Sequence, residues 1–219
     1  GITGSTSLTK SGAGTLTLTT TNTYTGVTTI NSGTLALSGS GSIASSANIT
    51  VAGGTKFDVS ALSTSFTLGT GQTLGNSAVN AVINGTNNTG SGTVSLVYDG
   101  VNPSFIITNG GMKLSANTVF TVNNIGTQLT AGFSYKIIAA AATGNVGLVA
   151  GTVPASVTVG GNGVAGPASL SVSNRELYLV VGLLIPTNQI SLFISPSGND
   201  LTGNGSITNS WQTLVQARN

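Results

Sequence analysis

The sequence predicts an all-β protein whose first half is a parallel β-solenoid, a coil in which each rung stacks on the one before. The first observation is a repeat, because Gly14-Thr15-Leu16 recurs as Gly33-Thr34-Leu35, 19 residues further on. The second is the alternation of apolar residues with threonine or serine, which gives a strand one inward and one outward face. The third is the glycine and asparagine between these strands, which favour sharp corners. Such a short-period repeat of strands is typical of stacked rungs.

Six glycines that precede alternating segments mark the expected rungs within residues 1–113, at a mean spacing of about 19 residues. They are Gly14, Gly33, Gly54, Gly71, Gly92 and Gly111. The residues expected to face inward are the pairs Leu16/Leu18, Val27/Ile30, Leu35/Leu37, Ile49/Val51, Phe57/Val59, Phe66/Leu68, Val79/Val82 and Val94/Leu96. Stacking in this way pairs each inner strand with the rungs above and below it.

Residues 114–186 are predicted to form a glycine-rich closing section with antiparallel pairing. Longer strands are expected at 118–122, 134–138, 156–159 and 176–181, with glycine-rich loops between them. Residues 170–172 and 176–181 flank Ser173-Asn174-Arg175, a pattern that predicts a hairpin. A section of this kind would cover the last rung, whose open strand edges otherwise invite further pairing.

Residues 187–219 are predicted to hold a linker, a strand and a short C-terminal helix. The linker is centred on residues 186–188 and the strand on 190–194. Trp211, Leu214, Val215 and Arg218 follow at helical spacing, and Asn209 or Ser210 is a suitable N-cap.

Composition excludes several classes of chemistry. The 219 residues contain six Lys or Arg, four Asp or Glu, no His and no Cys, with a formal net charge of +2. Nucleophilic triads and thiolate or imidazole zinc sites therefore lack their residues. No basic cluster is present to neutralise phosphates, so we expect no nucleic-acid partner. The longest apolar run, residues 177–185, is too short for a membrane helix, which needs about 20 residues, so no transmembrane segment is expected.

The four carboxylates, Asp58, Asp99, Glu176 and Asp200, are the remaining candidates for acid–base or metal chemistry. Asp58 and Asp99 are 41 residues apart, about two rungs, which places them on one face but too far apart for a glycosidase pair. Asp200 alone makes a weak calcium site. Residues 161–166 fit the letters of GxGxxG, but Pro167 follows and no helix pattern does. We therefore expect no catalytic, cofactor-binding or metal-binding residue, no cofactor and no enzymatic activity.

Residues 11–37 closely resemble the autotransporter-associated (passenger-associated transport) β-strand repeat. That motif joins Gly-x-Gly-Thr-Leu-x-Leu to Asn-Thr-Tyr-x-Gly and a closing Gly-Thr-Leu, as this segment does. Residues 120–181 also resemble the segments that come after such repeats in large secreted bacterial proteins, and residues 193–218 resemble the start of a right-handed β-helix domain of the pectate-lyase type. The resemblance implies a right-handed β-helical protein, secreted by a bacterium or displayed on its outer surface. It implies no catalytic residue, because the repeat is a transport and folding element.

These observations favour a non-catalytic structural or adhesive protein, the stalk or fibre segment of a larger extracellular protein. Neither end of the coil looks complete, so we expect head-to-tail contacts between like subunits, giving an oligomer or filament. Two alternatives remain open. One is the non-catalytic N-terminal part of a β-helical polysaccharide lyase or hydrolase. The other is a glycan-binding module that uses exposed tyrosines (Tyr24, Tyr98, Tyr135, Tyr178) or asparagine ladders, with a surface polysaccharide as its partner.

Overall fold

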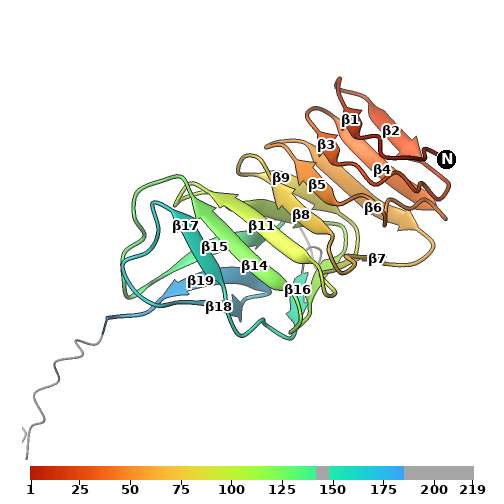
Figure 1. Ribbon diagram of the computed structural model, residues 1–219. Helices are drawn as coiled ribbons and strands as arrows, with labels where there is room; N and C mark the ends of the chain where they lie inside the picture. The colour runs from red at the N-terminus through yellow and green to blue at the C-terminus, as the bar shows by residue number, and fades with distance from the viewer. Residues whose placement is uncertain (142–147, 185–219) are drawn as a thin grey trace, which may run out of the picture. The chain divides into compact units, whose positions relative to one another are not determined.

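The computed structural model describes residues 1–141 and 148–184, and every regular element in these residues is a β-strand. The described strands all belong to one unit, Gly1–Leu183 (Figure 1). The predicted all-β class is therefore confirmed. The predicted linker, strand and helix of residues 187–219 lie outside the described residues, as does Asp200. None of the described residues forms a helix long and apolar enough to cross a membrane.

Three sheets build this unit, and the chain enters them in the same order on successive rungs. The first sheet is wholly parallel and contains, in spatial order, β1 (Leu8–Lys10), β3 (Thr28–Ile30), β5 (Asn48–Val51), β8 (Thr73–Asn76), β11 (Thr93–Tyr98), β14 (Val119–Asn124) and β17 (Thr158–Gly161). The second sheet begins with six parallel strands, β2 (Thr15–Leu18), β4 (Thr34–Gly39), β6 (Lys56–Leu62), β9 (Ala81–Asn84), β12 (Phe105–Thr108) and β15 (Phe133–Ala140). It ends with the antiparallel strands β19 (Glu176–Val181) and β18 (Ala168–Ser173).

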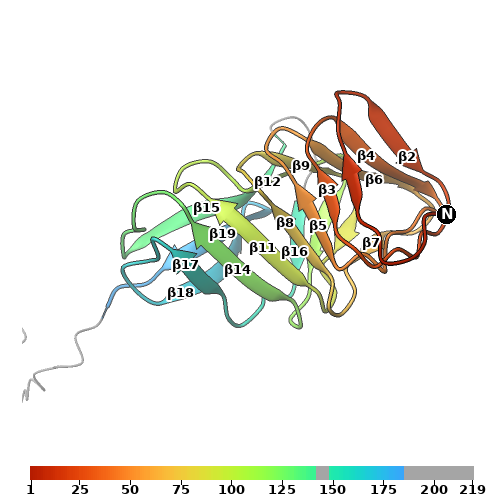
Figure 2. The same cartoon turned by 45° about the horizontal axis from the view of Figure 1, so that its top comes forward.

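The third sheet is the smallest, with four parallel strands: β7 (Phe66–Thr67), β10 (Asn87–Asn88), β13 (Gly111–Leu114) and β16 (Leu148–Gly151). Rung 1 comprises β1 and β2, and rung 2 comprises β3 and β4. Rungs 3 to 6 each contribute one strand to every sheet, and β17 begins rung 7. This is the arrangement of a β-solenoid. Figure 2 shows the strands of the first sheet in front of those of the second.

Apolar side chains stack in register through the interior of the coil. Leu16 pairs with Leu35, Leu35 with Phe57, Phe57 with Ile83, and Ile83 with Ile107. Four of these five side chains are completely buried, and Leu16, in the edge strand β2, is 36% exposed. The predicted adjacency of Leu16 and Leu35 is confirmed, and with it the stacked interpretation of the repeat.

Two of the residues expected to face inward, Val27 and Val82, do not, although Ile30, which was paired with Val27, is buried as predicted. Val27 is exposed just before β3, and Tyr24 is buried on the preceding corner instead. In β9 the buried residues are Ala81 and Ile83, so Val82 lies on the outer face. In a strand, a shift of one residue exchanges the inner and outer faces.

The glycine series does not mark one rung per glycine. Gly14, Gly33 and Gly54 all precede strands of the second sheet, as predicted, but Gly71 and Gly92 precede strands of the first sheet and Gly111 begins a strand of the third. Paired residues are 19 apart between β2 and β4, 26 apart between β6 and β9, and 37 apart between β14 and β17. The constant period of about 19 therefore fails after rung 2, because insertions at the corners lengthen the later rungs, and the glycines occur at different kinds of corner.

The antiparallel closing section is confirmed only at its end. β18 and β19 form the predicted hairpin, and both central residues, Asn174 and Arg175, have positive φ angles, as a tight two-residue turn requires. The strands β14, β15, β16 and β17 instead continue the parallel sheets. Residue 113 is therefore not where the pairing changes. Parallel stacking continues until β17, and β19 then closes the second sheet against β15.

Candidate functional site: a trough along the third sheet

The outer side of the third sheet carries a series of adjoining hollows. β7 and β10 have only two residues each, and residues of the corners beside them supply most of the lining of the first two hollows. Hollows of about 170, 340, 310 and 440 Å³ lie over this sheet and its corners. Each shares lining residues with the next: Ser65 joins the first two, Thr86 the second and third, and Lys113 the last two. We call this series the trough.

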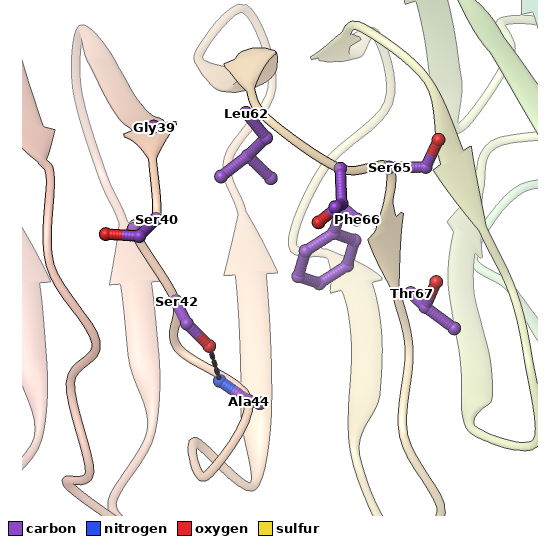
Figure 3. A pocket seen from close by; sticks show the side chains of 10 residues that line it. Gly39, Ser40, Ser42, Ala44, Leu62, Ser65, Phe66 and Thr67 are labelled. Atoms are coloured by element: carbon purple, nitrogen blue, oxygen red, sulfur yellow. Dashed lines mark hydrogen bonds between the residues drawn. The ribbon is translucent and has the colours of Figure 1, made fainter.

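The first hollow lies at a seam between rungs 2 and 3. β7 is the edge strand of the third sheet, so it has no strand neighbour on the side of rung 2. The corresponding segment of rung 2 bonds to rung 1 instead, through a parallel bridge between Thr21 and Ser42. Figure 3 shows the side chains of Leu62 and Phe66 between the two rungs, with the hydroxyl of Ser42 directed to the amide of Ala44.

Both ends of the seam are closed by hydrogen bonds. At one end the amide of Ser63 donates to the carbonyl oxygen of Gly39 over 3.0 Å. At the other, the buried carboxamide of Gln72 donates to the carbonyl oxygens of Ile43 and Ser46, over 3.0 and 2.9 Å. The middle of the seam is left without a backbone ladder. Its volume of about 170 Å³ is below the roughly 300–1,000 Å³ of drug-sized pockets, so it suits one small group.

The second hollow widens the trough across rungs 3 to 5. Its lining includes Ser60, Ser65, Thr86 and Asn109, and no charged residue lines either this hollow or the first. Further along, Thr67, Asn88 and Lys113 lie in register on the outer face, and the side-chain carboxamide of Asn88 donates to the hydroxyl of Thr67 over 3.2 Å. Lys113 is the one charged residue in the lining of these four hollows. The first two hollows therefore suit an uncharged, hydrogen-bonding ligand, and Lys113 brings a positive charge to the other two.

The structure does not bring Asp58 and Asp99 together on one face. Asp58 lies on the outer face of β6 and is in register with Asn84 and then Thr108. Asp99 lies instead in the corner between β11 and β12, where its carboxylate accepts hydrogen bonds from the amides of Val101 and Asn102. The expected shared face is thus wrong, because 41 residues correspond to different positions within rungs of unequal length.

Both carboxylates are kept ionised by local hydrogen bonds. Burial alone would raise the pKa of Asp58, but hydrogen bonds from the hydroxyl and amide of Ser60 and the charge of Lys56 lower it overall. The pKa of Asp99 is likewise lowered: burial opposes the shift, and hydrogen bonds from Asn102 and Val101 outweigh it. Each aspartate therefore stabilises its own turn and is poorly suited to hold a proton near neutral pH.

Glu176 lies at the exit of the β18–β19 hairpin and forms an ion pair with Lys136, at 3.1 Å. Its carboxylate also accepts a hydrogen bond from the amide of Ala140 over 3.2 Å and one from the hydroxyl of Tyr178 over 2.9 Å. Burial, followed by the bond to Glu176, raises the pKa of Tyr178. The carboxylate of Glu176 is thus fully engaged in joining β15 to β19.

Two of the four tyrosines are buried and cannot stack on a sugar. Tyr24 and Tyr98 are 0% and 1% exposed, so neither is one of the exposed tyrosines that the glycan-binding alternative requires. Tyr135 and Tyr178 are half-buried, and each hydroxyl is bonded within the protein, Tyr135 to the amide of Thr130 and Tyr178 to Glu176. An exposed tyrosine platform for glycans is therefore not formed by the described residues.

Residues 161–166 run from the end of β17 toward β18, and a strand rather than a helix follows Pro167. A phosphate site of the dinucleotide type depends on the amides of a helix N-terminus, which this loop lacks. Among the residues that the structure describes, no three His, Cys, Asp or Glu side chains gather as metal ligands. The expectation that no cofactor or metal binds stays a prediction.

Sequence reasoning missed two features, the trough and the environment of Lys10. Lys10 is buried, and its ammonium group donates to the carbonyl oxygens of Ser11, Gly12 and Ser32, over 3.1, 2.7 and 3.0 Å. It therefore joins the corners of rungs 1 and 2. In the sequence, the one feature that could have indicated this role is the position of Lys10 at the end of a strand, just before the corner at Gly12.

The comparisons with known proteins bear on these first rungs. Residues 8–37 match the family model described as Passenger-associated-transport-repeat. The match begins at Leu8 in β1 and ends at Leu37 in β4, so it covers the stacked strands of rungs 1 and 2. The resemblance given by the Gly-Thr-Leu and Asn-Thr-Tyr segments is confirmed over these residues. No curated protein and no solved structure matches the chain.

Proposed function

We propose that this chain is a non-catalytic structural segment, the stalk or fibre part of a bacterial protein that is secreted or displayed on the cell surface. The single observation that carries the proposal is the passenger-associated-transport-repeat in residues 8–37, folded as two rungs in register. A repeat of this kind supports a passenger exported through the outer membrane. Stacked parallel rungs suit a stalk, because backbone hydrogen bonds run along its whole length.

The chemistry of the chain supports a non-catalytic role. The sequence contains no His and no Cys, so the commonest bases and nucleophiles are missing. The described carboxylates Asp58, Asp99 and Glu176 each bond to groups of their own loop or strand pair. None of these three is placed to exchange a proton with a bound substrate in the trough.

Export is tested by locating the protein in the bacterium that makes it. Intact cells are treated with a protease that cannot enter them, and the chain is followed with an antibody to the folded unit. We expect the antibody signal to decrease on intact cells or to appear in the medium, while a cytoplasmic marker is unchanged. Antibody signal found only after the cells are lysed would contradict the proposed export.

The finer proposal is assembly through open strand edges. β1 and β17 each have one neighbour among the described strands, so each leaves a row of unpaired backbone groups. Leu8 and Lys10 bond to rung 2, since the amide of Leu8 donates to the carbonyl oxygen of Val27 and that of Asn31 to the carbonyl oxygen of Lys10. The amide of Thr9 therefore points to the free edge.

Thr9→Pro removes that free donor without touching the ladder to β3, and Thr9→Ala is the matched control. Light scattering over a range of concentrations and electron microscopy report assembly. We expect filaments or oligomers for the unchanged chain and for Thr9→Ala, and a lower mass for Thr9→Pro. A constant monomer mass for the unchanged chain contradicts assembly but leaves the export proposal standing.

Glycan binding is the second candidate function, and the uncharged first two hollows of the trough favour it. Hydroxyl and amide groups line its first two hollows, and the row of Thr67, Asn88 and Lys113 runs along the coil. An array of neutral and anionic glycans tests it, with Asn88→Leu as the variant and Asn123→Leu, on the outer face of the first sheet, as the control. We expect binding to neutral glycans that is insensitive to salt. The further alternative, the front part of a polysaccharide lyase or hydrolase, stays a prediction.

A further inference from the structure

The chain contains four Asn–Gly pairs, and the structure describes three of them: Asn84-Gly85, Asn109-Gly110 and Asn162-Gly163. In such a pair the backbone nitrogen of glycine can attack the side-chain carboxamide of asparagine, because glycine has no side chain to obstruct the approach. The reaction needs a glycine N–H and an asparagine carboxamide that are both free to move. Hydrogen bonds to either group oppose it.

Asn84-Gly85 is held on both sides. The amide of Gly85 donates to the carbonyl oxygen of Thr108 over 2.9 Å. The carboxamide of Asn84 donates to the hydroxyl of Ser60 over 3.2 Å and accepts a hydrogen bond from the hydroxyl of Thr108 over 2.8 Å. Both the nucleophile and the electrophile of this pair are therefore fixed between rungs.

Asn162-Gly163 is held in the same way. The amide of Gly163 donates to the carbonyl oxygen of Gly160 over 3.2 Å. The carboxamide of Asn162 donates to the carbonyl oxygen of Gly126 in the neighbouring rung. Attack within this pair requires both bonds to break first.

Asn109-Gly110 differs from both. Neither the amide of Gly110 nor the carboxamide of Asn109 bonds to any group among the residues that the structure describes. Asn109 is exposed, has a φ angle of 47°, and lies at the corner between β12 and β13. Its side chain lines the second hollow of the trough.

We propose that Asn109 is a site of spontaneous deamidation. The nitrogen of Gly110 loses its proton to base and bonds to the side-chain carbonyl carbon of Asn109. The bond from that carbon to the side-chain nitrogen then breaks, and ammonia leaves with a proton from water. Water opens the resulting five-membered succinimide to aspartate or isoaspartate. The net change replaces a carboxamide and one water by a carboxylate and an ammonium ion, without an enzyme or an oxidant.

The product changes the trough, and this consequence goes beyond the proposed stalk function. A carboxylate at position 109 places a negative charge in a hollow whose lining carries none. Isoaspartate also lengthens the backbone at a corner that packs tightly on the previous rung: a Cβ built on Gly110 would lie 2.3 Å from the carbonyl carbon of Gly85. The modification therefore marks aged molecules by both the charge and the shape of the trough.

The test is incubation of the purified full chain at mildly alkaline pH, followed by peptide mapping with fragmentation that separates aspartate from isoaspartate. We expect Asn109 to convert about tenfold faster than Asn84 and Asn162, since one net hydrogen bond is worth up to that factor. The rate at Asn109 should rise with pH, because the attacking nitrogen must lose its proton. Equal rates at all three sites would show that reaction occurs from the unfolded chain and would overturn the proposal.

Two variants sharpen the result. Ser60→Ala removes the acceptor of the Asn84 carboxamide, and we expect the rate at Asn84 to rise several-fold while that at Asn109 is unchanged. Asn109→Gly suits the positive φ angle and removes the carboxamide, so the acidic product at this corner should disappear while the thermal melting curve is retained. An unchanged rate at Asn84 in Ser60→Ala would contradict protection by hydrogen bonding.

Discussion

The short rungs 1 and 2 and the longer rungs 3 to 6 close their third side in different ways. In rungs 3 to 6 a strand of the third sheet closes it, and the backbone ladder carries the pairing from β7 to β16. In rungs 1 and 2, all of whose residues the structure describes, that side holds no strand. It has a bridge between Thr21 and Ser42, and backbone hydrogen bonds from the amides of Thr23, Thr25 and Gly26 to the carbonyl oxygens of Ile2, Gly4 and Thr6. A short rung has too few residues for a third strand, so side chains add to these backbone hydrogen bonds there.

Two side chains of the repeat provide this closure. The carboxamide of Asn22 donates to the carbonyl oxygens of Thr20 and Ser42, over 2.8 and 3.1 Å, and accepts a hydrogen bond from the amide of Ile2. The ring of Tyr24 is buried, and its hydroxyl lies 2.6 Å from that of Thr28. A rung whose closure also uses side chains depends on particular residues more than a rung closed by a strand ladder does. This explains why the recognisable motif lies in the short rungs.

Replacing Tyr24 by alanine tests this dependence with the largest expected effect. The change empties the core beside rungs 1 and 2 and removes the hydroxyl network, so we expect a loss of about 3–5 kcal/mol in the free energy of unfolding. Urea denaturation followed by circular dichroism measures it. Tyr24→Phe keeps the ring and should lose only about 1 kcal/mol. If Tyr24→Ala lost less than about 1 kcal/mol, this side chain would not be closing the short rungs.

Tyr98, at the end of β11, is a buried tyrosine of a long rung, and its ionisation should destabilise the fold at alkaline pH. Burial raises the pKa of Tyr98 to about 12, with smaller contributions from Asp99 and Tyr135. Its stabilising contribution is therefore constant below pH 10, the ordinary value, and is lost as pH rises toward 12 because the unfolded chain ionises first. The expected loss is about 3 kcal/mol. Denaturation at several alkaline pH values measures it, and Tyr98→Phe should show a smaller decline.

Asn22→Ala and Asn88→Ala compare the same substitution in a short rung and a long one. Asn22 is buried and has three backbone partners, so its loss should cost about 2 kcal/mol. Asn88 lies in β10, whose backbone is already paired on both sides, and its side chain bonds only to Thr67. We expect its loss to cost less than about 0.5 kcal/mol. Equal costs in parallel urea titrations would remove the distinction between the two kinds of rung.

The stacking of the first rungs was predictable because Thr15-Leu16 and Thr34-Leu35 repeat in sequence and pair in register. The later rungs were not, because insertions at the corners change the spacing without changing the pattern within each strand. β7 and β10 are two residues long, too short for any alternation to appear in sequence. The alternation of apolar and polar residues therefore could not predict the third sheet or the trough over it.

Composition left four carboxylates as candidates, but the sequence did not reveal where the described ones lie. Asp58 and Asp99 belong to different sides of their rungs, since a separation of 41 residues spans rungs of unequal length. The role of Lys10 was also hidden. A lone lysine is usually a surface charge, and its burial follows from carbonyl groups that only the stacking of two corners brings together.

Lys136→Met is expected to have the smallest effect on the free energy of unfolding. It tests whether backbone pairing holds the antiparallel end together, as it does the long rungs. The side chain of Lys136 is 42% exposed, and an ion pair at such a position contributes little, so we expect a loss of about 0.5 kcal/mol. Glu176 keeps its bonds from Ala140 and Tyr178, so it is not left unpaired. Glu176→Gln should instead lower the pKa of Tyr178 toward its ordinary value, which an absorbance titration reports. A loss near that of Asn22→Ala would mean that side chains, not the strand ladder between β15 and β19, hold this end together.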